Sequence, residues 1–187
     1  MALPDDIAAL RDRVLADLNA AHDYDTDTKS AWDIVRQVIA AGHTLSIRNM
    51  TTGTLTTQAD LAGKARGYVA EQLAEATFQR FISTFEIFLL DFLRLWLAAY
   101  PQSLGGKKLD FQEVLDAQDK DAIALLVIDK ELADVLHGPP AAWFKYVEDR
   151  VKLRCPGQNE IQQFAEAKAS RDVLEHNRGV VNKTYEA

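Results

Sequence analysis

The sequence contains very little cysteine, proline and glycine. Cys155 is the only cysteine in 187 residues, which excludes a disulfide within the chain and a zinc site built from several cysteines. Five prolines and nine glycines leave long stretches in which a helix can continue without a break. A single thiol suits a reducing compartment, and we therefore expect a cytoplasmic protein.

Long apolar runs are also absent. The most apolar segment, residues 81–99, contains Glu86, Asp91 and Arg94, whereas a membrane span needs about 20 predominantly apolar residues. The first six residues, MALPDD, are acidic and lack the basic flank and apolar run of a secretory signal. We expect a soluble protein without membrane contact, in which residues 81–99 form a buried helix.

The chain has no excess of positive charge. Its 21 basic and 28 acidic side chains give a net charge of −7. A protein that coats nucleic acid nonspecifically is thereby disfavoured, because that affinity comes from lysines and arginines that neutralise phosphates. Residues 141–187 alone hold eight basic and seven acidic side chains, so we expect an anionic ligand to prefer this part of the chain.

The first 57 residues predict two helices and a loop. Pro4 suits the first turn of a helix, which we expect to stop at the aspartate-rich residues 23–27. A second, short helix should end at Gly42, where glycine is a common C-terminal cap. Threonine-rich residues 43–57 predict a loop or a small hairpin. We place a domain boundary there, which makes residues 1–57 an N-terminal two-helix extension.

Residues 58–187 predict an antiparallel helical bundle. No proline interrupts residues 57–100, so one long helix is expected there, or two with a kink near Gly63 and Gly67. The later pattern predicts a brief helix opened by a capping box of Asp110 and Glu113, and three longer helices over residues 119–137, 141–153 and 159–177. No strand alternation or repeat is sustained, so the predicted fold is all-α with short connections between antiparallel neighbours.

Glu86 is an acidic residue on an otherwise apolar helical face. An unpaired carboxylate buried there would cost several kcal/mol, so Glu86 needs a partner. Two interpretations are open. Glu86 belongs to a structural ion pair or lies at a partly solvated edge of the core, or it is a site residue that holds a cation across the bundle.

Two other patterns suggest ligands but have simpler explanations. The aspartates in residues 23–27 are similar to the opening of a calcium loop, but Thr28 stands where that loop needs glycine and Ile34 where it needs glutamate. Trp143 and Tyr146 lie among basic residues, as in proteins that stack on bases. Aromatic residues at helical spacing usually face the core, and we expect core packing here.

The strongest candidate site is the segment from Arg171 to Asn182, which reads RDVLEHNRGVVN. It resembles the signature of the HEPN family, in which an arginine and a histidine are separated by four to six residues and asparagine often follows the histidine. Arg36 and His43 match the bare pattern too, but they flank a glycine that should end a helix. A long aromatic-rich helix with an embedded acid, here Glu86, also resembles the first core helix of many HEPN domains.

This resemblance implies a HEPN-type antiparallel helical bundle that acts as a metal-independent endoribonuclease without a cofactor. HEPN ribonucleases are homodimers whose arginine and histidine sets face each other across a cleft. The substrate implied is RNA, in a toxin–antitoxin, stress or defence system in which an antitoxin or another partner protein binds the chain. The implied catalytic residues are Arg171 and His176, and the implied supporting residues are Glu86, Asp172, Asn177 and Arg178.

The residue types suit this chemistry. A histidine can take the proton from a ribose 2′-hydroxyl or protonate the leaving 5′-oxygen, and an arginine can stabilise charge on the phosphate. The product would be a 2′,3′-cyclic phosphate, and DNA would be spared. Arg171 and His176 lie about 140° apart on a regular helix, so the long arginine side chain or a second copy must close the gap. Asp172 shares a face with His176, and its charge would repel phosphate.

The runner-up is a binding or assembly module without catalysis. In that case the same dimeric bundle scaffolds a partner protein or an anionic ligand. Arg171 then pairs with Glu175, and Asp172 with His176, as ordinary pairs four residues apart on a helix. The acidic net charge favours this module, whereas the intact Arg171 and His176 pair favours the enzyme.

Overall fold

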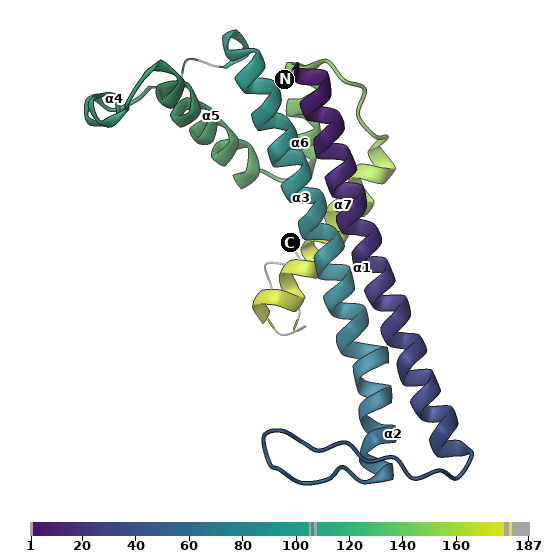
Figure 1. Ribbon diagram of the computed structural model, residues 1–187. Helices are drawn as coiled ribbons and strands as arrows, with labels where there is room; N and C mark the ends of the chain where they lie inside the picture. The colour runs from purple at the N-terminus through teal and green to yellow at the C-terminus, as the bar shows by residue number, and fades with distance from the viewer. Residues whose placement is uncertain (1, 105, 107, 178–179, 181–187) are drawn as a thin grey trace. The chain divides into compact units, whose positions relative to one another are not determined.

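The computed structural model describes residues 2–104, 106, 108–177 and 180 (Figure 1). These residues form helices joined by loops, with one isolated antiparallel bridge between Arg48 and Leu55 and no strand among them. The predicted all-α fold is confirmed. Contacts divide the chain into two compact units, which are Met1–Val14 with Ile82–Ala187, and Leu15–Phe81. The predicted domain boundary after residue 57 stays a prediction, because packing units need not be domains that fold alone.

The first helix, α1, runs without a break over Leu3–Ala40. The prediction of two helices in this region was wrong. Aspartate costs only about 0.7 kcal/mol or less per helical position relative to alanine, and no glycine or further proline stands between Pro4 and Gly42. Asp25 is in addition compensated, because Nζ of Lys29 lies 2.6 Å from its Oδ2 and Oγ1 of Thr77 donates to its Oδ1 at 3.4 Å.

The end of α1 and the loop after it follow the sequence pattern. Gly42 adopts a left-handed φ of +84°, which costs glycine little. The Gly42 N–H donates to the carbonyl of Ile39 and the His43 N–H to that of Val38, so that the last carbonyls of the helix are satisfied in a Schellman motif. The bridge between Arg48 and Leu55 confirms the predicted loop or small hairpin.

Residues 58–99 are helical but not regular throughout. Helix α2 covers Gln58–Gly67, a π-helical segment covers Tyr68–Leu73, and α3 covers Ala74–Ala99. The irregular segment therefore begins one residue after Gly67, close to where the sequence predicted a kink. Thr57 caps α2, because the Asp60 N–H donates to its Oγ1 at 3.1 Å.

Four helices follow in the second half of the chain. They are α4 (Phe111–Asp116), α5 (Lys120–His137), α6 (Pro140–Tyr146), which continues into a π-helical segment (Val147–Val151), and α7 (Gln158–Asn177). The predicted capping box is confirmed, since the Asp110 N–H donates to Glu113 at 2.8 Å. The predicted cap at Asn159 was wrong. Asn159 lies inside the first turn of α7, and Glu160 instead accepts from the Gly157 N–H, which makes Gly157 the residue that opens the helix.

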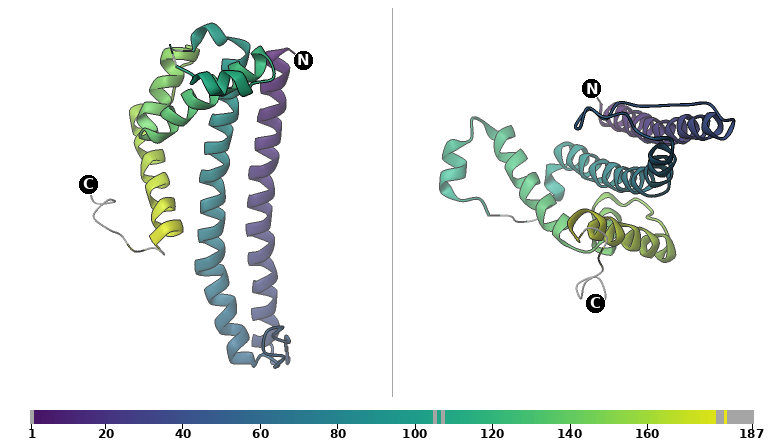
Figure 2. Two further views of the ribbon diagram at one scale, coloured as in Figure 1. Left: turned by 90° about the vertical axis from the view of Figure 1, so that its left-hand side faces the viewer. Right: turned by 90° about the horizontal axis from the view of Figure 1, so that it is seen from below.

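The core of the first unit joins five of these helices. The first turns of α1 and the last turns of α3 run antiparallel, and α5, α6 and α7 pack against α3 (Figures 1 and 2). The buried apolar residues of this core are Leu10, Leu89, Phe92, Leu93, Leu97, Ile128, Leu132, Trp143 and Val147. Trp143 and Phe144 are 1% and 6% exposed, which confirms that they serve packing. None of the helices in the described part of the chain is long and apolar enough to traverse a lipid bilayer.

Aromatic contacts attach α7 to this core. The ring of Phe164 on α7 lies 4.7 Å from that of Phe85 on α3 and 6.0 Å from that of Phe144 on α6, measured between centroids. Such pairs add about 0.5–1.5 kcal/mol beyond their burial. They hold the middle of α7 against α3, so that the last two turns of α7 come opposite Glu86.

Leu93→Ala should destabilise the protein by about 3 kcal/mol, because Leu93 is fully buried in the core and its truncation leaves a cavity. Urea denaturation followed by circular dichroism measures the loss. Leu153→Ala removes the same atoms from a side chain that is 48% exposed, and it should change the free energy of unfolding far less. Equal losses in the two variants would contradict this description of the core.

Candidate functional site

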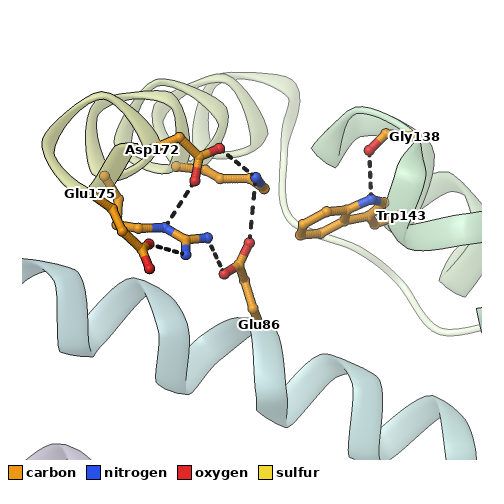
Figure 3. A network of polar contacts seen from close by, with 7 residues as sticks. Glu86, Gly138, Trp143, Asp172 and Glu175 are labelled. Atoms are coloured by element: carbon orange, nitrogen blue, oxygen red, sulfur yellow. Dashed lines mark hydrogen bonds and ion pairs between the residues drawn. The ribbon is translucent and has the colours of Figure 1, made fainter. Parts of the chain in front are cut away.

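The candidate site lies where α7 passes α3, within the first unit. Arg171 on α7 reaches across to Glu86 on α3, and its Nη2 donates to Oε2 of Glu86 (Figure 3). Nζ of Lys168 lies 3.7 Å from the other oxygen, Oε1. Glu86 is 18% exposed, so its charge needs this compensation. The sequence-based expectation that Glu86 requires a cationic partner is confirmed.

Arg171 is surrounded by three carboxylates. Besides Glu86, its Nη1 donates to Oε2 of Glu175 at 3.1 Å, and its Nε lies 3.1 Å from Oδ1 of Asp172. The side chain is 13% exposed. The pairing of Arg171 with Glu175, four residues apart, is the one expected from the sequence. The pairing with Glu86 comes from packing between two helices, and it fixes the guanidinium in one orientation.

Lys168 is the residue that the sequence analysis missed. Its Nζ lies 2.8 Å from Oδ2 of Asp172 and 5.8 Å from the centroid of the Trp143 ring. The sequence predicted that Asp172 lies on the same helical face as His176. In the structure the carboxylate of Asp172 pairs with Lys168. The signal was present in the sequence, because Lys168 precedes Asp172 by four residues on the same helix. What the sequence did not show is that Lys168 also reaches Glu86 on another helix.

His176 lies in the last turn of α7 and is exposed to solvent. One donor atom each of Asp172, Glu175 and His176 lie within 4.8 Å of one another. The imidazole therefore stands at the surface beside two carboxylates, while Arg171 points inward toward α3. Asn177 is the last residue of α7, and the predicted supporting residue Arg178 lies outside the described residues.

The charges of this cluster nearly cancel. Arg171 and Lys168 contribute two positive charges against the three carboxylates of Glu86, Asp172 and Glu175, so the cluster has a net charge of −1 while His176 is neutral. An anion that approaches from solvent meets Glu175, which is 49% exposed, before it meets Arg171. A phosphate group can contact the guanidinium only if it takes the place of a carboxylate.

The trio of Asp172, Glu175 and His176 also has the donor types of a divalent metal site. Asp172 is already paired with Lys168 and Arg171, and Glu175 with Arg171. A metal ion would have to compete with these cations for the same oxygens. We therefore derive no metal chemistry from the trio.

A small hollow adjoins the cluster. Its volume is about 240 Å³, and it is lined by Glu86, Ile87, Leu90, Leu136, Trp143 and Lys168. Ligand pockets are commonly about 300–1,000 Å³. The hollow is smaller than that and mostly apolar, so a polynucleotide would have to lie across the surface near His176 rather than enter it.

Tyr146 is a further polar group in this unit. Burial raises the pKa of its phenol, and the nearby carboxylate of Glu131, which accepts its hydrogen bond at 3.0 Å, raises it further. The phenol therefore stays protonated at neutral pH and serves as a donor. It ties α6 to α5 and is not available as a general base.

Comparisons with protein-family models, with curated proteins and with solved structures find no match to this chain.

We expect a strong energetic coupling between Glu86 and Arg171. Glu86→Gln and Arg171→Gln should each destabilise the protein by about 1.5–3 kcal/mol, because each removes the charged hydrogen-bond partner of a largely buried charge, whereas the double variant should lose much less than the sum. A double-mutant cycle by urea denaturation measures the coupling. Additive losses would show that the two side chains do not interact in solution.

Proposed function

We propose that this chain is a metal-independent endoribonuclease of the HEPN type, which cleaves RNA through attack of a ribose 2′-hydroxyl on the adjacent phosphate. One observation above all supports it. The exposed His176 stands near the end of α7, just beyond an arginine that Glu86 already orients from another helix. A solvent-exposed histidine and a preoriented guanidinium are the groups that this reaction uses.

The reaction needs one proton acceptor and one proton donor. The imidazole of one His176 takes the proton of the 2′-hydroxyl, and the oxygen attacks phosphorus. The bond from phosphorus to the 5′-oxygen breaks, and that oxygen takes a proton from His176 of a second copy. The products are a 2′,3′-cyclic phosphate and a 5′-hydroxyl. The homodimer follows from the resemblance to the family, in which two such sets face each other.

Arg171 would stabilise the transition state by exchanging partners. Glu86 holds Nη2 from the core side, while Nη1 pairs with the more exposed Glu175. The scissile phosphate takes the place of Glu175 at Nη1, and Glu86 keeps the guanidinium in position during the exchange. Arginine suits this task, because its planar group can serve two anions at once.

A second candidate is the binding module, and a specific observation favours it. The three carboxylates around Arg171 satisfy its charge within the chain, so Arg171 can act only as a tie between α7 and α3. The protein would then scaffold a partner through its helical surface and cleave nothing.

Purified wild-type protein should cut total RNA in excess EDTA and leave 2′,3′-cyclic phosphate ends. His176→Ala should lower the rate at least about 100-fold, in line with the usual contribution of general acid–base catalysis, and the exposed His176 should not be needed for folding. His137→Ala, which removes another exposed histidine of the same unit, is the matched control and should cut normally.

Arg171→Lys keeps the positive charge but loses the planar guanidinium that can serve two anions at once, so this variant should also cleave RNA more slowly than the wild type. Circular dichroism verifies that each variant is folded. If the folded wild type cuts no RNA offered, including tRNA, or if His176→Ala cuts as well as the control, the ribonuclease proposal is wrong and the binding module takes its place.

Glu175→Gln should raise RNA affinity by about three- to tenfold, because the phosphate no longer competes with a carboxylate for Nη1 of Arg171. Fluorescence anisotropy with a labelled RNA that carries 2′-O-methyl groups measures affinity without cleavage. Glu148→Gln removes the same charge from an exposed position on the π-helical segment after α6, and it controls for the general effect of charge. Equal gains in both variants would contradict the exchange.

A further inference from the structure

Helix α4 exposes most of its apolar side chains. Phe111 is 77% exposed, Leu115 60% and Val114 40%. Their spacing of three and four residues places them on one face of the helix. Contiguous exposed apolar surface of this kind usually marks an interaction site in a monomeric protein. That face lies on the opposite side of α4 from Glu113 and Asp116, which line the groove between α4 and α5.

A groove of about 450 Å³ lies between α4 and α5. Its floor is apolar and includes Ala122, Leu125 and Leu126, of which Leu125 is 47% exposed. Its rim is acidic and consists of Glu113, Asp116 and Asp129. The groove is large enough to receive a few side chains of a partner.

The segment that forms α4 and α5 is strongly acidic. Residues 110–134 contain eight acidic and two basic side chains, which is a charge of −6. Within the rim, Lys130 pairs with Glu113 at 2.7 Å and Arg94 with Asp129 at 2.8 Å. Asp116 accepts a hydrogen bond from the neutral amide of Gln112 at 2.9 Å, and its charge faces the groove.

We propose that α4 and α5 form a docking surface for a basic, amphipathic polypeptide segment of another protein. Its apolar side chains contact Leu125 and Leu126 on the floor of the groove, and its lysines or arginines meet Asp116 and the acidic rim. Charge complementarity selects this occupant. RNA, DNA and anionic membranes would be repelled by a surface of this sign. A second copy docked through the same groove would set one acidic rim against another.

The docking surface is distinct from the cluster around Arg171. It shares no residue with Glu86, Lys168, Arg171, Asp172, Glu175 or His176. The proposal therefore does not rest on RNA cleavage, and it holds for an enzyme and for a binding module alike.

The probe is a fluorescein-labelled peptide of about 18 leucines and lysines, in which leucines recur at helical spacing to give one apolar face. Its control is a scrambled peptide of the same composition without that face. Fluorescence anisotropy should show that the amphipathic peptide binds wild-type protein at least about tenfold more tightly than the scrambled one. Binding should weaken about tenfold in Leu125→Ser and also in Asp116→Lys, because both residues line the groove.

Matched controls lie elsewhere in the same unit. Leu153→Ser changes an equally exposed leucine and Asp149→Lys another exposed acid, and both variants should bind the peptide as the wild type does. Circular dichroism verifies folding, which exposed positions should leave intact.

Three outcomes overturn the proposal. The first is that the scrambled peptide binds equally well. The second is that the control variants lose as much binding as the groove variants, so that only net charge matters. The third is that sedimentation shows a dimer for the wild type and a monomer for Leu125→Ser, so that a second copy occupies the groove.

Discussion

The ion pair between Glu86 and Arg171 is the interaction on which the candidate site depends. A carboxylate on the apolar face of α3 is stable only with a cation beside it, and α7 supplies Arg171 and Lys168. The aromatic contacts of Phe164 bring α7 near α3, and the ion pair then fixes how its last turns are rotated. His176 is exposed because Arg171, five residues earlier, faces inward.

The proposed ribonuclease would give Arg171 two roles that conflict. As a structural tie Arg171 must keep its carboxylates, whereas as a catalytic group it would have to offer a donor to phosphate. The unequal burial of its partners would reduce this conflict, since Glu86 is 18% exposed and Glu175 49%. The exposed pair is the weaker one, because water screens it. Under that proposal, exchange at Glu175 would leave the tie to Glu86 in place, so that stability and chemistry would use different atoms of one guanidinium.

The uneven distribution of charge changes what the net charge of −7 means. Residues 110–134 carry −6 and residues 1–28 carry −5, whereas the cluster around Arg171 is close to neutral. The fields of exposed charges are screened over about 8–10 Å, so the acidic total of the chain says little about which ligand α7 accepts. The acidity of α4 and α5 supports the proposal of a basic partner there.

Features that act within one or two helical turns could be predicted from the sequence. The all-α fold, the cap at Gly42, the capping box at Asp110 and the pairing of Arg171 with Glu175 all follow from local spacing. The contact of Glu86 with a side chain 85 residues away could not be predicted in this way, because it depends on tertiary packing. Spacing rules describe neighbours on one helix, whereas the choice of the opposite helix is set by aromatic packing in the core, which no local pattern encodes.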